Sequence, residues 1–296
     1  WKPLCKDLCV RMFWIIGIVV TFGSVAGGYA PHGSFVVLFQ PLEYLIILGA
    51  GIGAFLQANP KWVVFGFLKS FGKLMKGAPY DKKAYTELLT LLYALFKLSK
   101  TKGMIALEPH IENPHESDLF QNFPSFTKNH HAVDFICDYL RLMTMGTENP
   151  HELEALMDQD LETHHNEGHA ISGAVTALGE ALPAFGIVAA VLGVIVTMGS
   201  IAEPPEVLGG LIAAALVGTF FGIFVAYGLF SPMGKNLEQF ADADGKYYEC
   251  MKQGLLAHLQ GYAPAVSVEF ARKTLYNHER PSFTELEEAC NEAPTP

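Results

Sequence analysis

The sequence predicts an all-α membrane protein with four transmembrane helices and a helical cytoplasmic domain formed by the 2–3 loop and the C-terminal tail. Half of the 296 residues are hydrophobic and only 17% are charged, below the roughly 25% of ordinary soluble domains. The mean hydropathy is +0.25. The charged residues are concentrated in residues 57–180 and 231–296, and long uncharged stretches separate them. This segregation is typical of membrane spans joined by water-facing segments.

Four apolar runs are long enough to cross a bilayer, which takes about 20 residues. They cover residues 13–31, 35–56, 183–202 and 207–230. The second is interrupted by Pro41 and Glu43. Pro183 is predicted to begin the third span and Pro232 to end the fourth, since proline is tolerated at helix ends.

The basic residues predict the orientation of the spans. Lys2, Lys6 and Arg11 precede the first span, whereas the short loops 31–34 and 203–206 contain no Lys or Arg. The positive-inside rule then places both termini and the long loop in the cytoplasm. The predicted segments are a cytoplasmic N-terminus 1–12, spans 13–56, a cytoplasmic loop 57–180, spans 181–231 and a cytoplasmic tail 232–296.

The water-facing segments are predicted to be helical. Asp81 can cap a helix that ends near Gly103, with apolar residues at helical spacing. Further helices are expected over 131–145, over 150–164 with proline in its first turn, and over 233–260.

Spans three and four carry stripes of small residues but no ionisable group. Such stripes let helix backbones approach closely. They can simply pack on each other, or they can line a path or hold a partner helix. Because proton-carrying membrane proteins place an ionisable group in the membrane, a partner would have to supply it here. Glu43, the only charged residue within a span, is expected to be an interfacial group near the outer surface.

Composition argues against several other classes. A net charge of −10 disfavours nucleic acid as a partner, and the five cysteines form no CxxC pair. No catalytic constellation or cofactor motif is found, so we expect neither an enzyme nor a cofactor. One alternative is a metal site formed by His164, His165 and His169 with Glu162 and Glu167, of which His165 and His169 are one helical turn apart.

Several motifs, in order along the chain, resemble the MotA family. They are LEPHIENP at 107–114, LPAFGIVAA at 182–190, ALVGTFFGIF at 215–224 followed by Pro232, GYAP at 261–264, VEFARKTL at 268–275 and ERPSF at 279–283. The similarity extends over essentially all of residues 12–290.

The resemblance implies a flagellar stator subunit that conducts protons and generates torque. The family assembles as five chains around two copies of MotB, whose single membrane helix carries the ion-binding Asp. On this basis the ion path and partner-helix face consist of Ala190, Gly193, Thr197, Gly218, Thr219 and Gly222. Pro183 and Pro232 match the prolines thought to couple ion passage to movement. Sodium-driven relatives have Thr at the position of Ala190, which provides no ligand oxygen, so proton coupling is expected.

In the cytoplasmic loop, the family engages the rotor protein FliG through a basic and an acidic residue. Glu108 matches the acidic one, and Lys100 replaces an Arg, which keeps the charge but loses the bidentate fork. The main alternative is a TolQ- or ExbB-like energiser of outer-membrane processes, although those relatives have three spans. A free-standing channel would need a selectivity ring that this sequence lacks.

Overall fold

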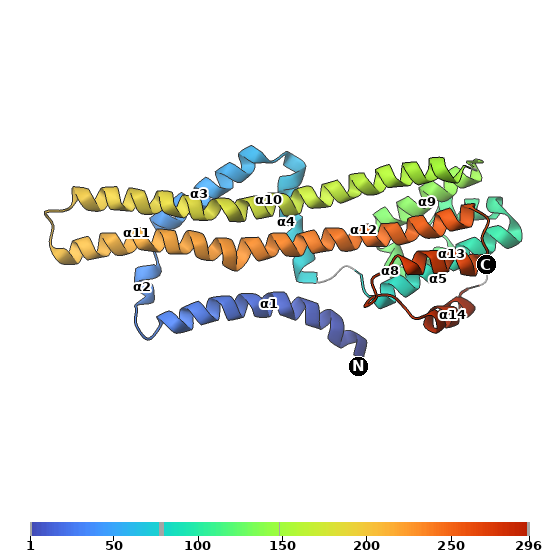
Figure 1. Cartoon of the computed structure of the whole chain (residues 1–296), viewed down its shortest axis with the longest axis horizontal. Helices are drawn as coiled ribbons and strands as arrows, with labels where there is room; N and C mark the ends of the chain where they lie inside the picture. The colour runs from blue at the N-terminus through green and yellow to red at the C-terminus, as the bar shows by residue number, and fades with distance from the viewer. Residues whose placement is uncertain (1, 77–79, 148, 295–296) are drawn as a thin grey trace. The chain divides into compact units, whose positions relative to one another are not determined.

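The computed structural model describes residues 2–76, 80–147 and 149–294, and every regular element in these ranges is a helix. The chain forms two compact units (Figure 1). Unit 1 consists of residues 1–78 and 167–241, and unit 2 of residues 79–166 and 242–296. The all-helical fold class is confirmed. The division into membrane and cytoplasmic segments remains a prediction.

Unit 1 contains the apolar helices. They are α1 (Lys2–Tyr29), α2 (Phe35–Leu38), α3 (Pro41–Ala58), α4 (Lys61–Lys76), the C-terminal part of α10 (Pro150–Gly199), α11 (Pro205–Val225) and the start of α12 (Ser231–Leu259). In the described residues, three segments are long and apolar enough to span a membrane: Phe35–Ala58, Pro150–Gly199 and Pro205–Leu259. The apolar part of α1, Phe13–Tyr29, is shorter and lies at the lower limit of about 17 residues for a span.

The expected interruption of the second span occurs just before Pro41. The helix is broken at Phe39 and Gln40, and Pro41 occupies the first turn of α3. Proline fits there because the N–H that it lacks has no helical partner in a first turn.

The prediction that Pro183 begins a helix is wrong. Helix α10 runs without a break for 50 residues, with Pro183 in its interior. The segments predicted separately at 150–164 and 183–202 are therefore one helix. The proline removes a single hydrogen bond, to the carbonyl of Gly179, and the packing of the helix on both sides outweighs that loss.

Pro232 was predicted to end the fourth span, but the helix continues past it. A π-helical turn over Ala226–Phe230 joins α11 to α12, and the N–H of Ser231 donates to the carbonyl of Ala226, five residues back. Pro232 then falls in the first turn of α12, where its missing N–H is tolerated. The wider π turn thus carries the helix past a residue that should stop it.

Unit 2 is a small helical domain with its own core. It comprises α5 (Lys82–Lys102), a 3₁₀ turn (Met104–Leu107), α6 (Glu108–Glu112), α7 (Asp118–Gln121), α8 (Pro124–Thr127), α9 (His130–Thr144), parts of α10 and α12, α13 (Pro264–Lys273) and α14 (Phe283–Asn291). Asp81 caps α5 as predicted, accepting from the Ala84 N–H at 2.7 Å, and Gly103 follows its last residue. The predicted helix over 131–145 is also confirmed, one residue earlier.

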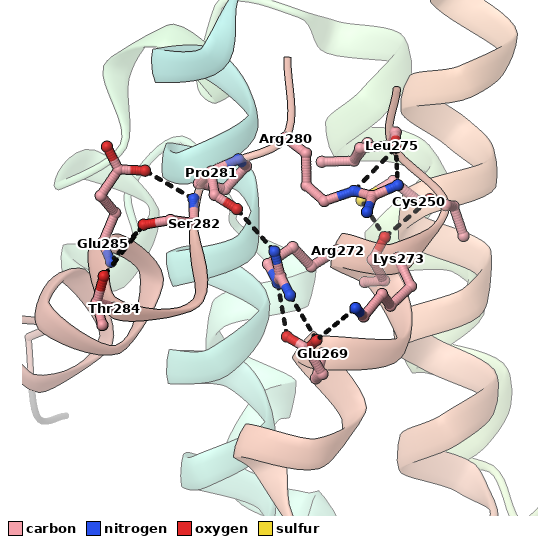
Figure 2. Close-up of polar contacts among 12 residues, drawn as sticks. Cys250, Glu269, Arg272, Lys273, Leu275, Arg280, Pro281, Ser282, Thr284 and Glu285 are labelled. Carbon is pink, nitrogen blue, oxygen red and sulfur yellow. Dashed lines mark hydrogen bonds and ion pairs between the residues drawn. The ribbon is translucent and has the colours of Figure 1, made fainter. Parts of the chain in front are cut away.

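The C-terminal motif is held together by ionic contacts and hydrogen bonds, of which those of Arg272 are the most buried (Figure 2). Arg272, 8% exposed, donates to both carboxylate oxygens of Glu269 at 2.6 Å and to the carbonyl of Pro281 at 2.8 Å. A capping box of Ser282 and Glu285 starts α14. Glu285 also pairs with Lys82 on α5 at 2.6 Å. The signature residues of this region therefore fasten the C-terminal helices to the domain.

We expect Arg272→Ala to destabilise this domain by about 2–4 kcal/mol, because Glu269 and the Pro281 carbonyl would lose their charged donor. Thermal unfolding of the purified chain measures this. Lys273→Ala is the matched control: Lys273 is 62% exposed and 3.8 Å from the same carboxylate, so about 0–1 kcal/mol is expected. Equal effects of the two substitutions would contradict the assignment.

The same contacts predict a pH dependence. Hydrogen bonds from Arg272 hold the pKa of Glu269 below its ordinary value of 4.5. The ion pair therefore stabilises the domain fully above that value, and its contribution is lost as the pH falls through the lowered pKa of the folded state.

Candidate functional site

The two long apolar helices of unit 1, α10 and α11, run antiparallel and side by side (Figure 1). They approach so closely that only glycine fits at the crossing. A β-carbon at Gly222 would lie 2.8 Å from the Leu182 carbonyl oxygen and 3.0 Å from the Gly186 Cα, and one at Gly186 would lie 3.1 Å from the Gly218 carbonyl oxygen. The small-residue stripes therefore bring two backbones into contact.

Further toward the end of α10 the same face continues. A β-carbon at Gly193 would lie 2.7 Å from the Ala215 Cβ, and Thr197, 8% exposed, donates its hydroxyl to the Gly193 carbonyl at 2.8 Å. Of the predicted partner-helix face, Gly193, Gly218 and Gly222 thus pack against the chain's own helices. For these three residues the structure shows contacts between the stripes.

Ala190 and Thr219 are each only half-buried, as is Gly193, whereas Gly218 and Gly222 are buried. Ala190 and Thr219 flank the same crossing. A β-carbon at Gly218 would lie 3.7 Å from the Ala190 amide nitrogen, and one at Gly186 would lie 3.5 Å from the Thr219 Cα. The structure therefore brings Ala190 and Thr219 to one locus and leaves part of each open to another molecule.

Glu43 joins this locus, which the sequence did not indicate. The residue is half-exposed, but its Oε2 atom is buried without a hydrogen-bond partner among the described residues. That oxygen lies 3.1 Å from the position that a β-carbon of Gly218 would take. The first turn of α3 thus directs a carboxylate at α11. The only sequence signal was that Glu43 is the single charged residue within a predicted span.

The two predicted coupling prolines lie at the same level of the helix pair. Gly179, whose carbonyl loses its partner because of Pro183, faces the end of the π turn. A β-carbon there would lie 3.2 Å from both the Phe230 Cβ and the Ser231 nitrogen. Ser231 immediately precedes Pro232. Both long helices are therefore irregular where they touch, and π turns of this kind are frequent at functional sites.

The predicted rotor-contact residues are both exposed in unit 2. Lys100, near the end of α5, donates to the Gly261 carbonyl at 3.1 Å. Gly261 has φ +91° and lies in the turn just after α12. Glu108 begins α6.

A buried histidine fixes the backbone beside Lys100. His258 Nε2 lies 2.6 Å from the Ser99 hydroxyl, and its ring stacks on Phe96 with centroids 4.4 Å apart. Burial, and to a lesser degree the charge of Lys100, lowers the pKa of His258 to about 4. His258 is therefore neutral at neutral pH and joins the ends of α5 and α12.

Of the histidines considered for a metal site, His164 packs its ring on Tyr248, with centroids 4.5 Å apart. Both residues lie in unit 2. This contact gives His164 a packing role.

Comparison with known proteins decides the family. The family model "Motility protein A N-terminal" matches residues 15–103, and that of the MotA/TolQ/ExbB proton channel family matches residues 128–249. Motility protein A of Escherichia coli (strain K12) is 47% identical over 94% of both chains. The chain belongs to the MotA family. Motility protein A of Bacillus subtilis (strain 168) is a more distant relative of this MotA-family chain, 31% identical over 94% of this chain and 95% of its own length.

Solved structures show the same fold. The flagellar MotAB stator complex from Bacillus subtilis matches with a TM-score of 0.71 at 26% identity, covering 86% of this MotA-family chain and 92% of that chain. A structure of C. jejuni MotAB matches with a TM-score of 0.76 at 20% identity, over 92% and 98%. Family and apolar helices together make this a multi-pass membrane protein.

Proposed function

We propose that the chain is the ion-conducting, torque-generating stator subunit of a bacterial flagellar motor, working with MotB. One structural observation carries the proposal. The uncharged apolar segments of α10 (183–199) and α11 (207–225) pack on each other yet leave Ala190 and Thr219 partly open at one locus. Relatives named motility protein A and structures of MotAB complexes support it. A TolQ- or ExbB-like role is less supported, because the N-terminal model that matches is that of motility proteins.

The proposed arrangement is a ring of five chains around two MotB helices in the inner membrane. Both chain termini face the cytoplasm, as the distribution of basic residues favours. Each MotB helix would supply the carboxylate that the apolar segments of α10 and α11 lack. Ala190, Thr219 and their neighbours would form the face that meets it.

Proton flow would act through the charge of that carboxylate. A proton from the periplasm neutralises the acid beside Thr219, and the neutral helix packs differently against the small-residue face. Each proton that crosses releases about 2.3 kcal/mol per 100 mV. This suffices for a conformational step if the two states differ in binding energy by a similar amount.

The side chain at position 190 favours protons over sodium. Sodium must exchange its water shell for oxygen ligands, and the methyl group of Ala190 offers none. Motor speed should therefore be independent of sodium concentration and collapse when a protonophore removes the proton gradient.

The experiment that tests the function is complementation. The chain, expressed with its MotB partner in a bacterium that lacks its own stator genes, should restore swimming. Thr219→Val, which keeps the side-chain volume and removes the hydroxyl, should reduce swimming while membrane insertion is unchanged. No motility from the unmodified pair, or full speed from the variant, would contradict the proposal.

We further propose that Lys100 and Glu108 transmit the step to FliG as a charged pair on the exposed surface of unit 2. Lys100→Glu is expected to reduce torque several-fold, since a reversed charge repels its partner surface. Lys83→Glu, an equally large change at another exposed lysine of unit 2, serves as the control. Swimming assays compare the two variants, and equal losses would show a general effect of charge.

A further inference from the structure

Helix α4 has a composition unlike the rest of the chain. Between Glu43 and Asp81 the sequence contains four lysines, all in α4, and no acidic residue, although the whole chain has a net charge of −10. Lys61, Lys69, Lys73 and Lys76 are these lysines. The last three follow i, i+4, i+7 spacing, which places such positions on one side of a helix.

One face of α4 packs against other helices of unit 1. Val63 and Leu74 are 2% and 3% exposed, and the ring of Phe67 packs on Phe55 of α3 with centroids 5.2 Å apart. Gly66 comes so close to Ile171 of α10 that a β-carbon would lie 2.6 Å from its Cδ1. The packing therefore determines which side chains of α4 face away.

The opposite face combines large apolar side chains with charge. Trp62, Phe65 and Leu68 are 49%, 63% and 59% exposed, and Lys61 and Lys69 are exposed beside them. Water alone would not favour three such apolar groups together. The mixture suits an interfacial helix, whose apolar groups enter the acyl boundary while lysines extend to the headgroups.

The position of α4 in the chain puts it at that boundary. The apolar helix α3 ends at Ala58 and α4 begins at Lys61, with only Asn59 and Pro60 between them. Pro60 starts the new helix by accepting from the N–H groups of Val63 and Val64. A helix that begins directly where a span ends lies at the level of the lipid headgroups.

We propose that the outer face of α4 binds anionic phospholipid headgroups and concentrates them around unit 1. The Lys61 and Lys69 ammonium groups contact the phosphates, while Trp62, Phe65 and Leu68 insert beside the acyl chains. Each lysine near an anionic membrane surface strengthens the attraction to it about fivefold. Orientation by the positive-inside rule accounts for the presence of lysines but not for the large apolar side chains exposed among them.

Fluorescence quenching of Trp62 tests this. Trp1→Phe and Trp14→Phe leave Trp62 as the sole tryptophan of the chain. The full chain is reconstituted in phosphatidylcholine vesicles in which a minor fraction of the lipid is brominated, either as phosphatidylglycerol or as phosphatidylcholine. We expect quenching of Trp62 to be several-fold stronger with the brominated anionic lipid.

The variant Lys61→Gln/Lys69→Gln should lose this selectivity, with the two lipids quenching equally, because Trp62 still reaches the bilayer. The control Lys83→Gln/Lys128→Gln removes the same amount of charge from exposed positions of unit 2. This variant should keep the selectivity for the anionic lipid. Equal quenching by both lipids in the unmodified chain, or selectivity that survives loss of Lys61 and Lys69, would overturn the proposal. Absence of quenching by either lipid would place the face against protein and overturn it as well.

Discussion

Replacing Gly222 by leucine is expected to abolish assembly and swimming. Even the β-carbon of alanine would lie 2.8 Å from the Leu182 carbonyl oxygen, which is backbone and cannot move aside as a side chain can. Gly222→Ala alone should cost at least about 2–3 kcal/mol, at the upper end of overpacking penalties. A leucine would hold α10 and α11 apart. The helices could still insert, since their hydropathy is undiminished.

The measurement is the amount of chain that purifies in complex with its partner, together with swimming. Gly209→Leu is the matched control, because Gly209 lies on the same helix with no atom of the chain within 4 Å of its β-carbon position. It should assemble normally. Normal assembly of Gly222→Leu would show that the tight crossing is dispensable.

The sequence predicted those features that depend on local pattern. Apolar run lengths indicated the three helices that are long and apolar enough to span a membrane. The Asp81 cap with Gly103 bounded α5 as observed. These signals are reliable because a cap or an apolar face acts within a few residues of the chain.

The sequence could not predict features that depend on which other helix of the chain each segment packs against. Proline normally ends a helix, so continuity through Pro183 and the π turn before Pro232 both contradict the local rule. The sequence could not decide which small residues contact the chain's own helices, since such stripes are alike whatever they face. The direction of Glu43 toward Gly218 likewise follows only from how α3 packs on α11.

These departures from local rules are concentrated where the function is proposed. A folded chain retains a helix-breaking residue or a widened turn when the rest of the structure compensates for it, and such strain is common at sites that must move. Gly179 supports this view, since its small size allows the proline-disturbed part of α10 to touch Ser231 next to Pro232. The two long helices are therefore irregular at a common level.

Pro183→Ala separates the roles of stability and movement. Alanine restores an N–H donor for the Gly179 carbonyl and removes the ring clash, which favours the helix by up to about 3 kcal/mol. We therefore expect thermal stability to be equal or higher. We also expect swimming to be largely lost, because we propose that α10 bends at this level when torque is generated.

The control is Pro150→Ala in the same helix, where proline occupies the first turn and its missing N–H has no consequence. That variant should swim normally. If the Pro183→Ala variant swam at full speed with raised stability, the proline would be only a tolerated irregularity. Gly179, Pro183 and the π turn would then have no part in generating torque. If this variant lost both stability and swimming, the proline would be needed to shape α10 for packing. Only one outcome identifies this level of α10 as a hinge: stability is kept or raised while torque is lost. In that case the substitution favours packing of the helix but prevents its motion.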